Sequence, residues 1–440
     1  MSSEYLSEDP SMRACLEESS KCIGCGTCLT NCPVYAQDHR EEVTARGRNR
    51  HIGDLLALPG SEKAAGDIGK CLLCGRCTMV CPRGIRNDLI VATLRQRLVA
   101  RNGLPFAKNI AFRKIMQDRA MMGRSVRMAA RLQKFLPGEA CVVVGNAECA
   151  AVPTVRRLPL FFSALAKGRR LPAVANVFLS ETLPEFIPTA GHFGVCRRVV
   201  YFSGCATEFV LPRTGEAIVR VLTEAGMDVL FPHAQGCCGL AAFANGDAET
   251  ASAMARRNLE VLEKLEADDI VTGCATCGSA LRDIWPRLGR DPEERARFTA
   301  LAAKVRDASE VILSAADPGA FPCRSRLPRG TTITWHEPCH LGRHQKVSRE
   351  PLTILRRTFG EDFHELKETG CCGFGGSFNL YHYSTSKAIS ALKAQNLRET
   401  AAECVVTSCP GCLIQLVDLM ARHHIPGRVL HLAEAITFRG

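Results

Sequence analysis

Ten cysteines in the last two thirds of the chain form two sets of five with nearly identical spacing. Matching cysteines of the two sets lie 134 or 135 residues apart, which indicates an internal repeat. Each set contains an adjacent pair flanked by glycines, in "GCCGL" and "GCCGFGG". The first set is Cys205, Cys237, Cys238, Cys274 and Cys277, and the second is Cys339, Cys371, Cys372, Cys409 and Cys412.

The adjacent cysteines are poorly placed to form disulfides with each other. Neighbouring Cα atoms lie about 3.8 Å apart, whereas disulfides usually span roughly 4.4 to 6.8 Å. A regular cubane [4Fe-4S] cluster takes four thiolates, and each set offers five. We therefore predict an unusual cluster, in which one iron is served twice or one sulfur bridges. The alternative is a four-cysteine site with a spare buried cysteine, which is more credible for one half than for both.

Each half alternates β and α structure, so we predict an α/β fold for both. A strand leads into the first cysteine, a helix and a strand return to the pair, and a second helix leads to a strand before C-x-x-C. The cysteines then lie at the carboxyl ends of strands, where open α/β sheets bind ligands. Glycines would let the backbone approach a bulky inorganic core, and a helix N-terminus behind each C-x-x-C would stabilise thiolates. The expected strands are 199–203, 268–273, 332–336 and 403–408, and the expected second helices are 249–265 and 385–400.

Two further cysteine runs occupy the N-terminal part of the chain. Both have the spacing C-x2-C-x2-C-x3-C-P, which is typical of cubane [4Fe-4S] sites whose fourth cysteine usually binds the other cluster. We therefore expect Cys81 to join the first trio and Cys32 to join the second. Zinc is the alternative, but it does not need this spacing twice. The runs are Cys22, Cys25, Cys28 and Cys32 before Pro33, and Cys71, Cys74, Cys77 and Cys81 before Pro82.

The segment 41–69 between these runs is predicted to form a helix, a turn and a helix. This spacing is much longer than in a compact bacterial ferredoxin, so we predict a helical two-cluster module. Arg46, Arg48 and Arg50 in this segment form either a docking edge or a solvated helix face, and we favour the solvated face.

The net charge of +11 is concentrated in residues 101–200, which contain 16 Lys or Arg against five Asp or Glu. Residues 112–138 have apolar side chains at roughly helical spacing. They predict either a packed helix with a solvated basic face or a docking surface for an acidic partner or an anionic membrane. We expect no nucleic-acid partner because the charge has no recognised binding motif or aromatic platform with it.

The remaining features concern location and domain limits. The N-terminus has no signal-peptide pattern, and no apolar run approaches the length of a membrane span, so we expect a cytoplasmic protein, soluble or peripheral at the inner membrane face. We predict a ferredoxin domain over 1–100, a basic, largely helical docking segment over 101–196, and α/β domains over 197–330 and 331–440. Six other cysteines match no motif and are predicted to be small core residues: Cys15, Cys141, Cys149, Cys196, Cys323 and Cys404.

The two halves resemble paired CCG domains. Their fusion behind a two-cluster module resembles the heterodisulfide reductase catalytic subunit, with kin among the iron–sulfur subunits of glycolate or lactate oxidase and anaerobic glycerol-3-phosphate dehydrogenase. The likeness covers about residues 15–110 and 195–440. It implies a noncubane [4Fe-4S] cluster on each set of five cysteines, a disulfide substrate between the two clusters, and an anaerobic metabolism. "WHEPCHLGRH" also resembles the family's second-domain signature, so His336, His340 and His344 are expected near the second cluster, where a structural role is favoured over proton donation.

Three functions follow as hypotheses. The first is a reductase that cleaves or forms a disulfide, with electrons entering through the cubane pair. The second is an electron carrier that accepts electrons from a separate flavoprotein and passes them toward a quinone or cytochrome subunit. No G-x-G-x-x-G fingerprint is present, so we expect no flavin or nicotinamide on this chain. The third, a zinc-stabilised scaffold, is the least favoured.

Overall fold

The computed structural model describes residues 10–57, 62–132, 138–139, 155–156, 171–172, 174–190, 197–315, 322–368 and 370–438. Contacts divide the chain into two units. The first unit comprises Met1–Arg113, Gly239–Ala251 and Cys371–Ser390, and the second comprises Lys114–Cys238, Ser252–Gly370 and Ala391–Gly440. The two short segments of the first unit each directly follow or include an adjacent cysteine pair.

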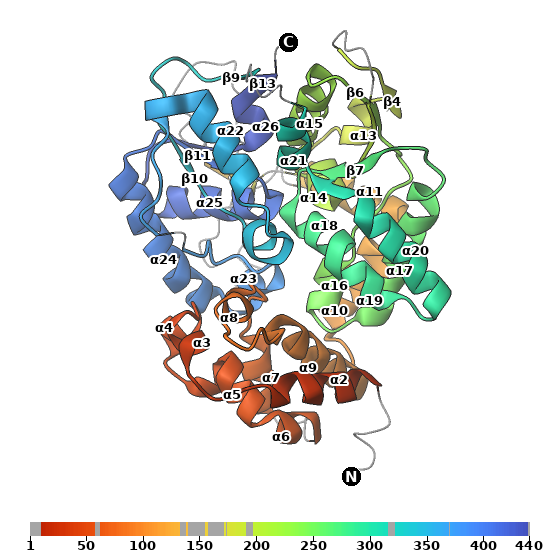
Figure 1. Cartoon of the computed structure of the whole chain (residues 1–440), viewed down its shortest axis with the longest axis vertical. Coiled ribbons are helices and arrows are strands. Elements are labelled where there is room, and N and C mark those ends of the chain that lie inside the picture. Colours follow the sequence, from red (N-terminus) through yellow and green to blue (C-terminus); the bar gives the residue numbers. More distant parts are fainter. Residues whose placement is uncertain are drawn as a thin grey trace. The chain divides into compact units, whose positions relative to one another are not determined.

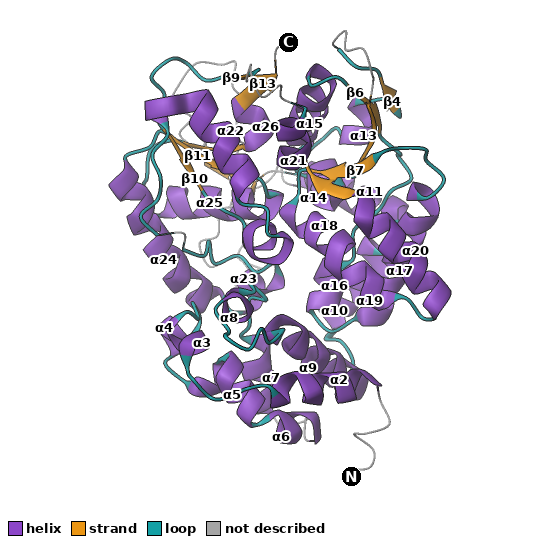
Figure 2. Ribbon diagram, in the orientation of Figure 1, coloured by secondary structure: helices purple, strands orange, loops and turns teal. Residues whose placement is uncertain are grey.

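The first unit is helical in its N-terminal part, as predicted (Figures 1 and 2). Its core lies between α2, α6, α7 and α9, where Leu56, Ile68, Ile90 and Leu94 are buried together. The predicted helix, turn and helix of 41–69 is present as η1, α5, α6 and α7. The helices are α2 (Pro10–Ser20), α3 (Thr27–Thr30), α4 (Tyr35–Asp38), η1 (Glu41–Val43), α5 (Ala45–Arg50), α6 (Ile52–Ala57), α7 (Glu62–Gly69), α8 (Arg76–Met79), α9 (Asn87–Asn102), α10 (Phe106–Asn109) and η2 (Ile110–Met116).

The interpretation of α5 as a solvated arginine face is wrong for Arg48. Its side chain is buried, and its Nη2 donates to the carbonyl of Asp67 at 2.9 Å. Arg50 is exposed as expected, and Arg46 forms an ion pair with Glu41. The error arises because Arg48 is hydrogen-bonded to a residue of α7, 19 positions away, which the local sequence does not reveal.

The second unit contains a five-stranded sheet of order β4-β6-β5-β7-β8, in which only β4 is antiparallel to its neighbour. The chain leaves β5 for β6 on one side and then crosses to β7 on the other side. Such a switch point opens a crevice at the carboxyl ends of the strands. The strands are β4 (Phe186–Ile187), β5 (Arg197–Tyr201), β6 (Met227–Leu230), β7 (Asp269–Thr272) and β8 (Val305–Asp307).

The helices of this first half follow the predicted order. Helix α15 lies between β5 and β6, and α17 lies between β6 and β7, with its end close to the predicted one. The helices are α13 (Leu179–Thr182), α14 (Gly204–Phe209), α15 (Pro212–Glu224), α16 (Leu240–Ala244), α17 (Ala248–Leu262), α18 (Ala275–Ser279), η5 (Ala280–Ile284), α19 (Trp285–Leu288), α20 (Pro292–Lys304) and α21 (Ala308–Ser314).

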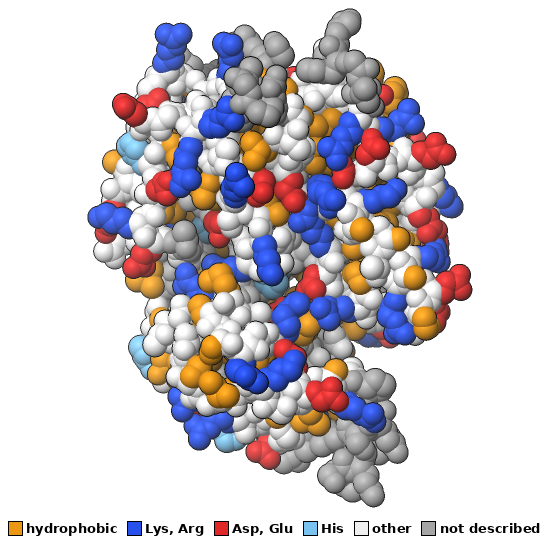
Figure 3. All heavy atoms as spheres, in the orientation of Figure 1, with side chains coloured by type: hydrophobic (Ala, Val, Ile, Leu, Met, Phe, Trp, Pro, Cys, Tyr) orange, Lys and Arg blue, Asp and Glu red, His pale blue; other side chains and the backbone are white. Residues whose placement is uncertain are grey.

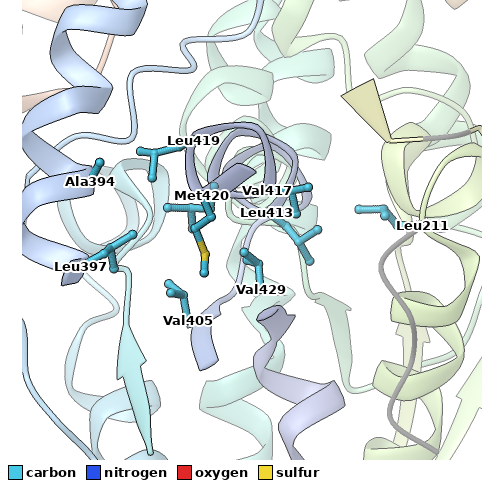
Figure 4. Close-up of a cluster of buried hydrophobic side chains, with 10 residues drawn as sticks. Leu211, Ala394, Leu397, Val405, Leu413, Val417, Leu419, Met420 and Val429 are labelled. Carbon is cyan, nitrogen blue, oxygen red and sulfur yellow. The ribbon is translucent and has the colours of Figure 1, made fainter. Parts of the chain in front are cut away.

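The second half has a parallel sheet of order β10-β11-β12. The strand expected before its cysteine pair is reduced to one bridge, between Ile333 and Phe363. Its core includes Leu397 of α24, Val405 of β11, Met420 of α25 and Val429 of β12, which converge in Figure 4. The elements are β10 (Ile333–Trp335), η6 (His340–Gln345), α22 (Arg349–Phe359), η7 (Gly360–Asp362), α23 (Ser377–Tyr381), α24 (Tyr383–Thr400), β11 (Cys404–Thr407), α25 (Pro410–Arg422), β12 (Arg428–His431) and α26 (Leu432–Ala435).

Two small antiparallel sheets complete the described strands. One pairs β9 (Cys323–Ser325) with β13 (Ile436–Phe438), and the other contains β1 (Gly138–Glu139), β2 (Val155–Arg156) and β3 (Leu171–Pro172). The mixed α/β fold, with a helical N-terminal part and a repeated α/β half, is therefore confirmed. The four domain boundaries stay a prediction.

The basic segment contains the helix α11 (Arg119–Leu132). Its larger apolar side chains do not all pack inward, since Met121, Met128 and Leu132 are exposed. Over the face drawn in Figure 3, basic, acidic and apolar side chains are interspersed. None of the described helices combines the length and apolar character that a membrane crossing requires.

Three of the six cysteines without a motif are buried, as predicted, namely Cys15, Cys323 and Cys404. The other three, Cys141, Cys149 and Cys196, lie outside the described residues.

Candidate metal centres

The first N-terminal hollow brings Cys81 together with the first cysteine trio. Cys22, Cys25, Cys28 and Cys81 all line it, beside Arg46, and Cys25 is exposed. The hollow encloses about 360 Å³, including the space open to solvent. The sequence predicted that Cys81, the fourth cysteine of the second run, joins the first trio, and the structure places it there.

The second hollow brings Cys32 together with Cys71, Cys74 and Cys77, and the buried Arg48 also lines it. Burial, with repulsion from Cys71 and Cys74, raises the pKa of Cys32 to about 11. Burial likewise raises the pKa of Cys77 well above its usual value, with added repulsion from its cysteine neighbours. Thiols packed so closely do not all ionise by themselves, whereas a bound cation holds them as thiolates, so this donor set fits a metal cluster.

The first CCG-type set follows three neighbouring strands. Cys205 follows β5, the Cys237–Cys238 pair follows β6, and Cys274 follows β7. Contact with Cys237, together with burial, raises the pKa of Cys205 well above its usual value. Contact with Cys238 has the same effect on Cys277. The five cysteines of this set therefore meet at the predicted sheet edge, and their crowding again fits a cationic centre.

The backbone of the first adjacent pair is held by two buried side chains. The Nδ2 of Asn258, on α17, donates to the carbonyl of Cys237 at 3.0 Å. The Nε1 of Trp285, on α19, donates to the carbonyl of Cys238 at 2.9 Å. Sequence reasoning missed both residues. A lone tryptophan in a cysteine-rich half was the only signal available, because indole N–H groups need a partner when buried.

The glycine after each pair also serves a purpose that the sequence did not predict. Gly239 and Gly373 have φ angles of +82° and +85°. A Cβ at Gly239 would lie 3.0 Å from the carbonyl oxygen of Ala251, and one at Gly373 would lie 2.7 Å from that of Ser386. These glycines therefore permit close approach to the helix that follows, α17 or α24, and the predicted approach to an inorganic core stays a prediction.

The second set is divided between the two units. Cys339, Cys409 and Cys412 belong to the second unit, while Cys371 and Cys372 belong to the first. Cys371 lies beside an apolar cluster that includes Leu72 and Phe378, and Cys32 and Cys74 of the second hollow flank the same cluster. One cysteine of the second pair is thus close in space to the second N-terminal hollow.

The two C-x-x-C loops contact each other directly. The amide of Ala275 donates to the carbonyl of Ser408 at 3.2 Å, and the Thr276 hydroxyl lies 3.4 Å from the Sγ of Cys409. Contact with Cys274 helps to lower the pKa of Cys409 well below its usual value. Each loop begins a helix, with Cys274 at the N-cap of α18 and Cys409 at the N-cap of α25, as predicted.

The three candidate histidines lie close to these loops in the second unit. His336 is buried, with a ring nitrogen within 4.8 Å of the Cys412 Sγ. His340 lies 3.1 Å from the Ser279 hydroxyl and stacks on His344 with ring centres 4.6 Å apart. These contacts fix the position of His340, and the choice between a structural role and proton donation stays a prediction.

Comparison with known proteins identifies the same modules. A family model described as "Cysteine-rich domain", CCG, matches residues 199–282 and 333–417, and a 4Fe-4S dicluster domain matches residues 18–85. Lactate utilization protein A of Exiguobacterium sp. is 30% identical over 243 residues, which cover 54% of this chain and 96% of that protein. The chain belongs to the CCG-domain iron–sulfur family.

Two other members of the CCG family match nearly the whole chain. The probable glycolate oxidase iron-sulfur subunit of Bacillus subtilis is 28% identical over 431 residues, 95% of this chain and 93% of that protein. One subunit of the dihydromethanophenazine:CoB–CoM heterodisulfide reductase of Methanosarcina barkeri is 26% identical over 430 residues, 92% of this chain and 89% of that protein. This chain is therefore an iron–sulfur electron-transfer subunit of the kind found in oxidoreductase complexes with other redox subunits.

Proposed function

We propose that this chain passes single electrons through two cubane clusters to a paired CCG site that reduces, or in reverse forms, a disulfide. The observation that carries the proposal is the direct contact between the two C-x-x-C loops, at Ala275 and Ser408 and at Thr276 and Cys409. Reduction of a disulfide takes two electrons and two protons and gives two thiols. Two adjacent centres suit this reaction because each can receive one sulfur.

The proposed ligands follow the grouping in space. One cubane takes Cys22, Cys25, Cys28 and Cys81, and the other takes Cys32, Cys71, Cys74 and Cys77. When bound, the clusters supply one-electron transfer, and those of the CCG sets also supply iron that binds substrate sulfur. We assign the noncubane clusters to Cys205, Cys237, Cys238, Cys274 and Cys277, and to Cys339, Cys371, Cys372, Cys409 and Cys412.

The apolar cluster beside Cys371 indicates where electrons enter the CCG pair. The buried side chains of Leu72 and Phe378 pack against Cys371 on one side and against Cys32 and Cys74 of the second hollow on the other. The five cysteines of the first set belong entirely to the second unit. We therefore propose that the second CCG set receives electrons first, from the site of Cys32, Cys71, Cys74 and Cys77.

The test is iron and acid-labile sulfide per chain on anaerobically purified protein, with EPR spectra before and after addition of a disulfide. About 16 iron, at four per cluster, with a signal induced by the disulfide would support the reductase. About eight to twelve iron without such a signal, unchanged by reconstitution, would contradict it. A colourless protein that contains zinc would contradict every iron–sulfur function.

The second candidate is an electron carrier without its own substrate. It is favoured by the match to a probable glycolate oxidase iron-sulfur subunit over 95% of this chain. In this version a flavoprotein that oxidises lactate, glycolate or glycerol 3-phosphate donates electrons, and a quinone or membrane cytochrome subunit accepts them. Co-purification with a flavin subunit, and electron transfer only in its presence, would favour the carrier. Disulfide reduction by the isolated chain with an artificial donor would contradict it.

A peripheral position at the inner face of the membrane, through the basic segment, forms part of either version. The four-domain division at residues 100, 196 and 330 is proposed with it. Sedimentation with anionic vesicles tests the membrane position, and recovery of the chain in the supernatant would contradict it.

A further inference from the structure

Arg95, on α9, makes an unusual set of hydrogen bonds within the first unit. Its Nη2 donates to the carbonyls of Gly69 and Cys71, at 3.0 and 2.6 Å, and also reaches that of Ile68 at 3.2 Å. Its Nη1 donates to the carbonyl of Ala244 at 2.6 Å. One guanidinium therefore joins the end of α7, the first cysteine of the second hollow, and the end of α16.

These acceptors explain why an arginine is needed here. The last carbonyls of a helix have no partner inside the helix and carry partial negative charge. Ile68 and Gly69 end α7, and Ala244 ends α16. A planar fork of five N–H donors can serve both ends at once, which the point charge of a lysine cannot.

The guanidinium also brings a charge that no carboxylate among the described residues neutralises by hydrogen bonding. Arginine stays protonated in proteins, so the Nη2 that donates to the Cys71 carbonyl at 2.6 Å belongs to a charged group. In the described part of the chain, its hydrogen-bond acceptors are all carbonyl oxygens. At the first hollow, by contrast, Arg46 forms an ion pair with Glu41 at 3.1 Å.

The contact with Ala244 ties this arrangement to the segment after the first cysteine pair. Helix α16 begins directly after Gly239, which follows Cys238. A Cβ at Gly246 would collide with the carbonyl oxygen of Arg95, so the turn after α16 packs directly on α9. The Oδ1 of Asn245, in the same turn, accepts from the hydroxyl of Ser377, which follows the second pair.

We propose that Arg95 is a positioning residue that fixes the Cys71 loop against α16, and that its charge raises the reduction potential of the cluster held by Cys32, Cys71, Cys74 and Cys77. The inference rests on the proposed function only in that these four cysteines hold a cubane. A positive charge stabilises the reduced cluster, which carries one more negative charge than the oxidised one. An electron that reaches this cluster is therefore held more tightly than it would be without Arg95.

The experiment uses the full chain, purified anaerobically, as wild type, Arg95→Gln, Arg95→Lys and Arg101→Gln. Arg101 is an exposed arginine on the same helix, so its substitution is a matched control for the loss of one charge. Iron per chain and EPR-monitored redox titrations are measured. In Arg95→Gln, we expect the reduced-to-oxidised ratio of one cubane at fixed potential to fall about tenfold, which is about 59 mV for a one-electron couple. Arg95→Lys, which keeps the charge, is expected to shift less, and Arg101→Gln is expected to match the wild type.

The outcomes separate the inference from the function on which it rests. A wild-type protein without two cubane signals would contradict the proposed clusters themselves. Two cubane signals with equal potentials in Arg95→Gln and Arg101→Gln would overturn the role of Arg95 alone. If Arg95→Gln does not fold, Arg95→Lys decides: an altered signal from one cubane supports the positioning role, and a titration identical to the wild type overturns it.

Discussion

The two adjacent cysteine pairs have the same local sequence and different surroundings. The first pair is held by hydrogen bonds from Asn258 and Trp285, and both of its cysteines belong to the second unit with the rest of their set. The second pair belongs to the first unit, and Cys371 lies beside the apolar cluster of the second N-terminal hollow. Duplication therefore preserved the spacing of the cysteines, while the side chains packed against each pair placed only Cys371 of the second pair beside the second N-terminal hollow.

The largest effect is expected from removing one C-x-x-C ligand in each half. Cys274→Ser and Cys409→Ser should each remove a cluster, because a serine oxygen is a poor ligand for iron that thiolates hold. Iron per chain should fall by about four in each variant. If electrons enter the CCG sites through the second set, Cys409→Ser should also prevent reduction of the first CCG cluster by the cubanes. Rapid-freeze EPR measures this reduction.

Cys274→Ser should leave reduction of the second CCG cluster intact. Equal reduction of the remaining CCG cluster in both variants would show that the two halves receive electrons independently. That result would contradict the proposal that only the second set receives electrons directly from the cubanes.

The next effect concerns the side chains that support each pair. Trp285 corresponds to Met420 in the repeat, and only the indole donates to a pair carbonyl. Trp285→Phe removes the buried hydrogen bond to the Cys238 carbonyl and leaves a small cavity, so we expect a loss of about 2–4 kcal/mol in the free energy of unfolding. Met420→Leu, a swap of nearly equal volume, should cost less than about 1.5 kcal/mol. Anaerobic denaturant titrations measure both, and equal losses would contradict the assigned role of Trp285.

The grouping of the cysteines could be predicted because most members of each group lie only a few residues apart, in runs with a recognisable spacing. The crossing of Cys32 and Cys81 and the position of the C-x-x-C motifs at strand ends follow from local runs and from alternating β and α segments. Arg48, Arg95 and Trp285 were misjudged or missed because their roles depend on partners 19 or more residues away. The strand predicted before the second pair is reduced to one bridge at Phe363. It was predicted because the repeat suggested a counterpart of β6 at this place.

The third effect concerns how the segment after the first pair is anchored. Asp247 is buried and pairs with Arg113 at 3.0 Å. Burial alone would raise the pKa of Asp247, but Arg113 and Thr250 hold it below its usual value. Because Arg113 is partly exposed, we expect Arg113→Gln to lower the free energy of unfolding by only about 1–2 kcal/mol at pH 7.

The sign of the pH dependence follows from this lowered pKa. The stabilisation is complete above the unfolded pKa of about 4 and is lost as pH falls through the lower folded pKa. The difference between wild type and Arg113→Gln should therefore shrink below about pH 4, which unfolding rates after a pH jump can follow. A difference that stays constant from pH 7 to pH 3 would show that the ion pair is not its source.

The smallest effect is expected in the segment that follows the second pair, where Tyr381 contacts Lys108 of α10. There the Nζ of Lys108 lies 4.3 Å from the centre of the Tyr381 ring, so this is a cation–π contact rather than an ion pair. Burial, with repulsion from Arg95, lowers the pKa of Lys108 to about 8, so the charged form costs stability at neutral pH. Lys108→Met should therefore raise the free energy of unfolding by up to about 1 kcal/mol at pH 7, opposite in sign to Arg113→Gln. The gain should vanish between pH 8 and about pH 10.4, because the unfolded state then binds the proton that the folded state has lost. Denaturant titrations at pH 7 and above pH 10 test this prediction. A loss of stability at pH 7 in Lys108→Met would mean that the cation–π contact outweighs the cost of burying the charge. The Lys108–Tyr381 contact would then stabilise the fold, as the Arg113–Asp247 ion pair does.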